Sequence, residues 1–151
     1  MKNELDEALV AKYPKIFKYR HAPMTHTAMC WGFECGDGWF NILDQLMSNI
    51  QHHIDWKEKQ RNWAVTFNSK AKPEEFREVH ELIPQVTLDQ VKEKLGTLRF
   101  YYTGGDEYIR GMVTMAEAMS GTTCETCGNV GKFRGKSWFY TSCDEHNLKG
   151  E

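Results

Sequence analysis

The sequence contains no apolar run long enough to cross a bilayer, and its 151 residues carry a formal net charge of only -2. A transmembrane helix needs about 20 apolar residues, so we expect a soluble protein without a membrane partner. The nearly balanced charge excludes a general attraction to phosphate backbones, so binding to DNA or RNA would need a local basic patch. No signal peptide is recognisable and the five cysteines are odd in number, which predicts a reducing cytoplasm.

Sequence signatures of catalysis are also missing. The chain has no nucleophile elbow, no phosphate-binding Gly-x4-Gly-Lys loop, no dinucleotide fingerprint and no His-Glu-x2-His pair. It also contains no internal repeat and no low-complexity tract. Because active sites assemble in space, a hydrolase stays an alternative, but the sequence favours a binding protein and predicts no catalytic residue.

The pattern that is present most clearly is a pair of short metal-ligand motifs near the C-terminus. Cys124 and Cys127 form one C-x2-C pair, and Cys143 and His146 follow with the same spacing. Each pair can present two ligands from one tight turn, and three thiolates with one imidazole suit tetrahedral zinc. These four ligands fill every coordination position and leave none for a metal-bound water. The motif therefore predicts a structural Zn²⁺ site and not a catalytic one.

The composition, with 40% hydrophobic residues, is that of a folded globular protein, and the predicted helices and strands place it in the α+β class. We expect a domain of residues 1–121 that carries a zinc module of residues 122–151. The longest predicted element is an amphipathic helix over 38–59, and shorter helices are predicted over 4–13 and 106–120. The apolar positions of the long helix recur every three or four residues and should face the core; they are Trp39, Ile42, Leu43, Leu46, Met47, Ile50 and Ile54.

Three other segments have weaker patterns. Residues 15–28 are mixed in character and are predicted to form a surface loop. The alternation of Trp63, Val65 and Phe67 predicts a short strand. One or two helical turns are expected over 74–82, before Pro84.

The segment from Gln85 to Tyr102 has two interpretations. Residues 88–95 could form a helix between a capping box and Gly96. Alternatively, Val86–Lys92 is a strand that turns near Lys94 to Gly96 and pairs with the strand-like run Thr97–Tyr102, and the alternating side chains of that run favour this hairpin. A second hairpin is predicted over 133–141, inside the zinc module. A knuckle, a hairpin and a final ligand pair are typical of a zinc ribbon or a truncated treble clef.

Three blocks of the chain, taken in order, resemble a known family. They are Glu34-Cys-Gly-Asp-Gly-Trp39, Val91-Lys-Glu-Lys-Leu-Gly-Thr-Leu-Arg-Phe-Tyr101 and the zinc motif from Cys124 to His146. The family consists of small, mostly uncharacterised proteins encoded by bacteriophages and prophages. The resemblance implies a viral protein that acts in the bacterial cytoplasm, where such proteins often counter host defences. It implies no catalytic residues.

A basic and aromatic surface is expected on the first hairpin. Lys92, Lys94, Arg99 and Tyr101 would lie close together, and arginine binds phosphate oxygens while aromatic rings stack on bases. Trp31 and Trp39 flank a glycine-rich turn and could complete a pocket for a nucleotide-type ligand. The alternative is an ordinary solvated strand face with Trp39 in the core.

Further candidates lie outside this hairpin. Alternating cations on the second hairpin could bind nucleic acid; they are Lys132, Arg134 and Lys136. Cys30 and Cys35 could form a second metal site with His26, although buried free thiols are the simpler interpretation. Asp106 and Glu107 are interpreted as helix-start charges. His53 is expected to be a boundary residue beside the apolar stripe. The methionines at positions 112, 115 and 119 are expected to pack in the core.

These observations lead to one functional hypothesis and two alternatives. The leading hypothesis is a zinc-stabilised phage protein that sequesters a small nucleotide-type ligand, such as a host immune signal. The first alternative is a zinc-finger regulator that binds nucleic acid or a host protein, and the second is a nucleotide hydrolase. A homo-oligomer is compatible with each of them.

Overall fold

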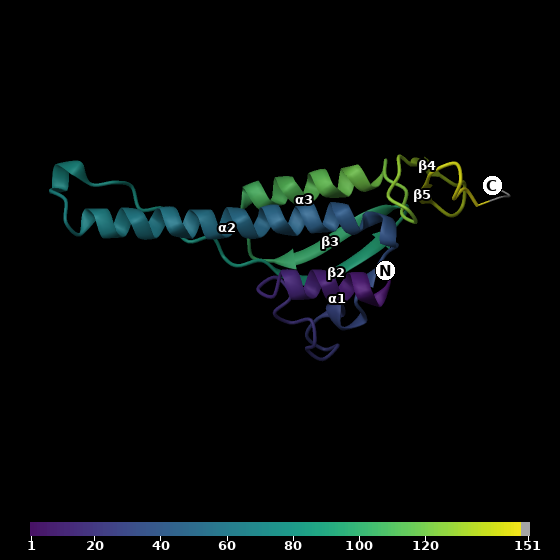
Figure 1. Ribbon diagram of the computed structural model, residues 1–151, viewed down its shortest axis with the longest axis horizontal. Coiled ribbons are helices and arrows are strands. Elements are labelled where there is room, and N and C mark those ends of the chain that lie inside the picture. Colours follow the sequence, from purple (N-terminus) through teal and green to yellow (C-terminus); the bar gives the residue numbers. More distant parts are fainter. Residues whose placement is uncertain (149–151) are drawn as a thin grey trace.

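The protein is described by a computed structural model in which residues 1–148 are placed. It is a mixed α+β structure with one long helix, two small sheets and a Cys/His cluster near the C-terminus, as predicted (Figure 1). Within this described part of the chain, no helix combines the length and the apolar character needed to span a bilayer. The elements are α1 (Asn3–Lys12), η1 (Ala28–Trp31), β1 (Phe33–Glu34), η2 (Asp37–Trp39), α2 (Phe40–Asn68), η3 (Pro73–Glu75), β2 (Thr87–Lys94), β3 (Thr97–Thr103), α3 (Glu107–Ser120), β4 (Lys132–Arg134) and β5 (Tyr140–Ser142).

The larger sheet has the strand order β1-β2-β3, with β1 parallel to β2 and β2 antiparallel to β3. Within the segment 85–95, residues Thr87–Lys94 therefore form a strand of a hairpin and not a helix. Lys94 pairs with Thr97, so only two residues form the turn. Both of them, Leu95 and Gly96, have positive φ angles (53° and 82°), which is the requirement of a type I′ turn.

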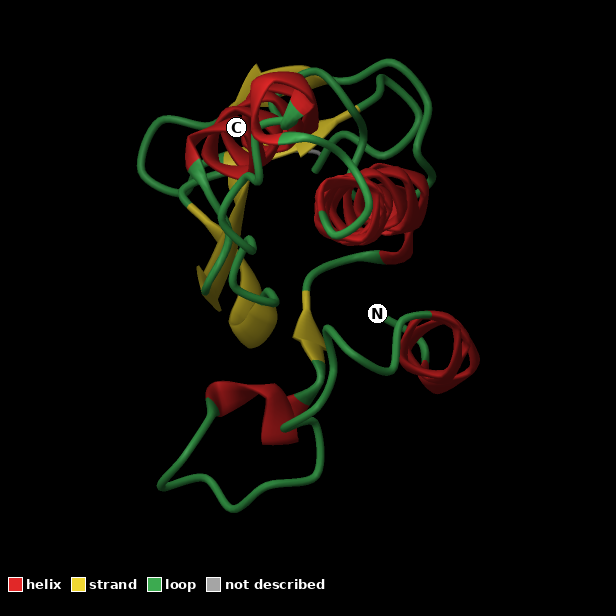
Figure 2. Ribbon diagram, turned by 90° about the vertical axis from the view of Figure 1, so that its left-hand side faces the viewer, coloured by secondary structure: helices red, strands yellow, loops and turns green. Residues whose placement is uncertain are grey.

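The helices α2 and α3 lie on the same side of this sheet (Figures 1 and 2). The inward side chains of the hairpin are buried in one core with the apolar stripe of α2; among them are Leu88, Val91, Leu98 and Phe100. The stripe of α2 is buried as predicted, from Trp39 to Ile54. The opposite face of the hairpin carries Lys92, Arg99 and Tyr101, none of which is buried.

The middle of the chain differs from the prediction. The helix α2 continues to Asn68, so the strand predicted over Trp63, Val65 and Phe67 is wrong. No turn residue interrupts the chain before this point, and the rings of Trp63 and Phe67 stack four residues apart on the helix, with centroids separated by 5.5 Å. The helical turns predicted over 74–82 are limited to η3, which ends at Glu75.

Residues 15–28 are irregular, as predicted, but they are not all at the surface. Ile16 and Phe17 are buried in the core, and the carbonyl oxygen of Ile16 accepts a hydrogen bond of 3.0 Å from the backbone N–H of Leu88. The segment therefore holds the first residues of β2 in place.

Candidate metal centre

The first ligand pair lies on a tight turn directly after α3. The N–H of Gly128 donates to the carbonyl oxygen of Cys124 (2.8 Å), and the N–H of Cys124 donates to the carbonyl oxygen of Asn129 (2.8 Å). Gly128 has a φ of +79°, which side chains other than that of glycine rarely allow. The turn therefore folds back so that the two cysteines of the C-x2-C motif point to the same side.

The second ligand pair follows a short hairpin. The strands β4 and β5 pair antiparallel, with Lys132 opposite Ser142 and Arg134 opposite Tyr140. Cys143 comes directly after β5, and His146 follows on the next turn of chain. The pairing of β4 with β5 thus brings the end of the described chain back to the knuckle at Cys124.

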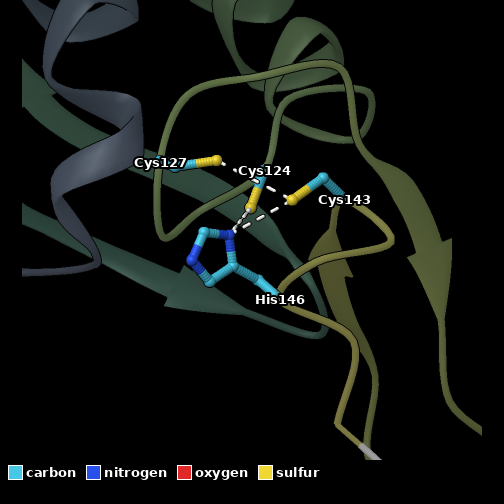
Figure 3. Close-up of side chains that lie close together, drawn as sticks. All are labelled: Cys124, Cys127, Cys143 and His146. Carbon is cyan, nitrogen blue, oxygen red and sulfur yellow. Dashed lines mark hydrogen bonds between the residues drawn. The ribbon is translucent and has the colours of Figure 1, made fainter.

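The four side chains converge on a single point (Figure 3). The sulfurs of Cys127 and Cys143 lie 3.8 Å apart, and Nδ1 of His146 lies 3.7 Å from the Cys124 sulfur and 3.2 Å from that of Cys143. All four donor atoms are within 4.8 Å of one another. A zinc ion with bonds of about 2.3 Å to sulfur sets tetrahedral sulfur ligands about 3.8 Å apart. The group is positioned to hold a metal ion and is compatible with zinc.

The local electrostatics favour a thiolate at Cys124. Burial alone would raise the pKa of this thiol, but backbone N–H groups of Cys143, Cys127 and Thr126 point at the sulfur and lower its pKa to about 6. A thiolate is the form of cysteine that binds metal. The backbone around the knuckle therefore stabilises the charge state that a metal ion requires.

The glycine-rich turn of residues 36–38, directly before α2, contacts the turn that contains Cys124 and Cys127. The N–H of Gly38 donates to the carbonyl oxygen of Glu125 (2.7 Å), and the N–H of Gly36 donates to its carboxylate (2.9 Å). Burial raises the pKa of this carboxyl group, while the bond from Gly36 opposes the rise. The indole N–H of Trp39 donates to the carbonyl oxygen of Thr123 (2.9 Å). These three hydrogen bonds tie the turn with the first two cysteines to the residues directly before α2.

The turn of the first hairpin contacts the module from another direction. The hydroxyl of Thr141 donates to the carbonyl oxygen of Gly96 (2.7 Å), and the N–H of Glu125 donates to the carbonyl oxygen of Thr141 (3.0 Å). The ring of Phe133 lies so close to Gly96 that an added Cβ would be 2.7 Å from it. The three sequence blocks that carry the family resemblance therefore meet around the metal centre.

Substituting Gly38 with alanine should loosen this contact. An added Cβ would overlap the backbone of Cys124 and approach the nitrogen of Gly128 within 2.5 Å, and neither backbone atom can move freely. We expect the variant to lose about 1–3 kcal/mol of unfolding free energy in urea titrations. Gly111→Ala is the matched control, because no atom lies within 4 Å of its added Cβ. Equal effects of the two substitutions would contradict the close packing at Gly38.

The hairpin brings together three of the predicted ligand-binding residues. Lys92 lies directly opposite Arg99 in the β2–β3 register, and its ammonium group lies 5.5 Å from the ring centroid of Tyr101. One guanidinium nitrogen of Arg99 donates to Thr97 and to the carbonyl oxygen of Leu98, both at 2.6 Å. Lys94 is exposed at the end of β2.

The two tryptophans assigned to the same pocket are placed very differently. Trp39 is fully buried, with 0% of its surface exposed, so its proposed contact with a ligand is wrong and it belongs to the core. Its position directly before a buried helical stripe explains this result. Trp31 is 64% exposed and lies on η1.

Sequence reasoning missed a shallow hollow next to Tyr101. It has a volume of about 380 Å³ and is lined by residues 24–28, together with Asp89, Gln90 and Tyr101. The hydroxyl of Thr27 donates to the carbonyl oxygen of Asp89 (3.1 Å), which holds the irregular segment against β2. No sequence pattern links 24–28 to the hairpin, so the hollow could not have been found without the fold.

Two of the three cations of the second hairpin share one carboxylate. Arg134 forms an ion pair with Asp144, and Lys132 lies 3.5 Å from the same carboxylate. These contacts lower the pKa of Asp144, with the hydrogen bond from Arg134 as the largest cause. Lys136 is exposed, and within residues 1–148 it forms no ion pair.

Cys30 and Cys35 do not join a second metal cluster in the part of the chain that the structure describes. Cys35 is buried, and burial raises the pKa of its thiol to about 12. Cys30 is half-buried, and His26 lies in the hollow beside Tyr101. These placements fit the interpretation of Cys35 as a buried free thiol.

One side of α3 is less buried than the sequence predicted. Met115 and Met119 are exposed, so their assignment to the core is wrong, while Met112 is half-buried. All three line an open, mostly apolar groove of about 730 Å³ between α3 and α2. Their intervals of three and four residues place them on one face of α3, but α2 covers that face incompletely.

Asp106 begins α3, as predicted, and accepts a hydrogen bond of 3.0 Å from the N–H of Ile109. Its second carboxylate oxygen lies 2.9 Å from Nε2 of His53, a partner that the sequence did not suggest. Burial opposes this charge, but the bonds from His53 and Ile109 lower the pKa of Asp106 overall. The pair joins α2 to the start of α3 and fits the expected boundary role of His53.

Comparison of the chain with family models, with curated proteins and with solved structures found no match. The resemblance to phage-encoded proteins therefore stays an expectation from the sequence. The functional conclusion depends on the geometry of the site and on the chemistry of its residues.

Proposed function

We propose that the Cys₃His group holds a structural zinc ion and that the protein is a zinc-stabilised binding protein. Support for zinc comes from the donor set and from the sulfur–sulfur separation of 3.8 Å, which matches a tetrahedral zinc site. The order of knuckle, hairpin and final ligand pair is that of a zinc ribbon or a truncated treble clef. The role of the ion is mechanical: it fixes residues 122–148 internally, so that they can pack against the turns at Gly38 and Gly96.

The ligand in this proposal is a small nucleotide-type molecule that binds the outward face of β2 and β3. The observation that carries the proposal is the cluster in which Lys92 lies over Tyr101 and opposite Arg99. Two cations can bind phosphate oxygens, and the free face of the tyrosine ring can stack on a base. Lys94, at the end of the same strand, extends the positive charge.

The hollow beside Tyr101 provides room for the rest of such a ligand. Its volume of about 380 Å³ is within the size range of small-molecule sites. Gln90 and Asp89 line it. The Gln90 amide donates to Glu34 (2.7 Å) and the Asp89 carboxylate accepts from Thr103 (2.9 Å), and the remaining donors and acceptors of both groups can hydrogen bond to a base or a ribose. Phosphates would thus contact Lys92 and Arg99, while the nucleoside would occupy the hollow.

The biological role in this proposal is sequestration. Lys92, Arg99 and Tyr101 on the outward hairpin face are suited to hold phosphates and a base, and the proposal assigns them no catalytic role. A phage-encoded protein with such a face would lower the free concentration of a host nucleotide signal in the bacterial cytoplasm. The released ligand should therefore be chemically unchanged.

Nucleotide binding can be tested with linear and cyclic nucleotides in thermal-shift and calorimetric titrations. A bound nucleotide should raise the melting temperature in proportion to its occupancy. Arg99→Ala should weaken binding by about 10–100-fold, since hydrogen bonds to charged groups contribute about 1.5–3 kcal/mol. Lys136→Ala, on the other hairpin, is the control and should bind as the wild type does. Absence of binding to every nucleotide would refute the proposal, and chromatographic conversion of the ligand would favour the hydrolase.

A second candidate function, binding of a host protein, is favoured by the surface of the zinc module. Val130 and Trp138 are 86% and 66% exposed there, and Phe133 is also exposed. Asp144 offsets part of the positive charge of Arg134 and Lys132 beside these apolar side chains. If the module bound nucleic acid instead, its affinity for duplex DNA or RNA would fall steeply as the salt concentration rises. Trp138→Ala should reduce protein binding and leave nucleotide binding unchanged.

A further inference from the structure

The distal part of α2 and the segment that follows it form an arm, which we define as residues 56–83. Figure 1 shows this end of α2 extending beyond the sheet and the other helices, with the chain returning along it. Among these residues, all of which the structure describes, only Ala64 is buried. The arm therefore has almost no core of its own.

The arm nevertheless carries many large apolar side chains. Trp56 and Trp63 are 52% and 59% exposed and lie seven residues apart, so they share one side of the helix. The remaining exposed apolar residues of the arm are Val65, Phe76, Val79 and Leu82. Isolated helical segments of this length are marginal in water, and a concentration of exposed aromatic residues is typical of an interaction site.

The returning half of the arm also has unused backbone groups. The turn is closed by Asn68, whose side chain exchanges two hydrogen bonds of 2.8 Å with the backbone of Arg77. Beyond it, residues 78–83 form no backbone hydrogen bond with any part of the chain that the structure describes. An extended segment with free N–H and C=O groups can accept a partner along its length.

Charge is segregated between the two halves of the arm. Residues 56–72 contain five lysine or arginine side chains and one glutamate, a net charge of +4. Residues 73–83 contain four glutamates and one arginine, a net charge of -3. Within residues 1–148, none of these six cations lies within ion-pair distance of a carboxylate. Glu78 lies 3.3 Å from Nδ1 of His80. The cations of the arm and its other carboxylates are thus available to pair with another molecule.

We propose that the arm binds the arm of a second copy of this chain in a two-fold symmetric dimer. In such a dimer the same surface meets itself, so the surface must contain both members of each complementary pair. The basic helix of one arm would lie against the acidic returning segment of the other, and the symmetry axis would repeat the contact. Trp56, Trp63 and Phe76 would be covered in this interface. Binding of a partner protein of another sequence would not require the arm to carry both signs of charge.

A charge-reversal experiment tests the proposed dimer. The full-length protein should sediment at twice the 17.6 kDa of the chain, and high salt should weaken the association. One variant replaces exposed cations of the helix and turn (K59E/K70E/K72E), and the other replaces exposed carboxylates of the returning segment (E74K/E78K/E81K). Each variant alone should show a dimer dissociation constant raised at least about 100-fold, because like charges then face each other.

Mixing the two variants should restore the dimer, since each reversed surface then meets a complementary one. Unchanged circular dichroism and metal content in each variant show that the fold is retained. A monomeric wild-type protein, single variants that dimerise as the wild type does, or a mixture that stays monomeric would each overturn the proposal. A nucleotide-binding result on the hairpin bears only on the proposed function, so the two can fail separately.

Discussion

Replacing Cys143 with serine is expected to yield a chain without a stoichiometric metal ion and with residues 122–148 unfolded. The Cys143 sulfur lies within 4 Å of both the Cys127 sulfur and Nδ1 of His146, so its loss opens the cluster. Structural zinc contributes about 10–16 kcal/mol of apparent binding free energy in small zinc domains, and this energy holds the domain folded. Plasma mass spectrometry of the purified protein should show metal close to zero. Limited proteolysis should cleave after α3.

Cys30→Ser is the matched control for this substitution. Cys30 is half-buried and lies outside the cluster, so the variant should keep its metal and its proteolytic resistance. A strong chelator added to the wild-type protein should reproduce the behaviour of the Cys143 variant. If the Cys143 variant kept one ion per chain and a wild-type melting curve, the structural role of the metal would be refuted.

Substituting Trp39 with alanine should cost about 3–5 kcal/mol of unfolding free energy. Trp39 is fully buried at the start of α2, and its indole N–H donates to the carbonyl oxygen of Thr123, one residue before the first metal ligand. The substitution therefore leaves a cavity in the core and an unpaired carbonyl group at the base of the knuckle. Urea titrations followed by far-ultraviolet circular dichroism measure the loss.

Trp31→Ala provides the comparison for Trp39→Ala, because Trp31 is 64% exposed. Its removal should change stability by no more than about 0.5 kcal/mol. Trp39→Phe should lie between the two, since it keeps most of the ring volume and loses only the hydrogen bond. Similar losses for Trp31→Ala and Trp39→Ala would contradict the placement of Trp39 in the core.

The metal cluster could be predicted from the sequence because each of its ligand pairs is local. A C-x2-C or C-x2-H spacing determines which side chains one turn can bring together, whatever the rest of the chain does. The stripe of α2 was predictable for a similar reason, since helical periodicity from Ile42 to Ile54 depends only on near neighbours.

Three other features were predicted less well. The alternation of Trp63, Val65 and Phe67 suggested a strand, but local backbone bonding continues the helix and stacks two of these rings. Met115 and Met119 have helical spacing and remain exposed because α2 does not cover them. The contact of Asp144 with Arg134 joins residues ten positions apart, and the sequence pattern did not indicate it.

The glycine-rich turn at residues 36–38 shows how the metal module depends on the body. Its glycines allow the backbone of Glu125 and Cys124 to approach closely, and the turn before Thr97 does the same for Phe133 and Tyr140. A zinc ion would then fix the module internally, while these two turns fix its position on the body. Metal binding and packing of the body are therefore expected to be coupled.

X-ray absorption at the zinc edge of the purified, full-length protein tests the central claim most directly. The account predicts one zinc ion per chain with three sulfur ligands at about 2.3 Å and one nitrogen ligand at about 2.0–2.1 Å. A coordination shell dominated by oxygen, or protein that carries no stoichiometric zinc, would contradict it.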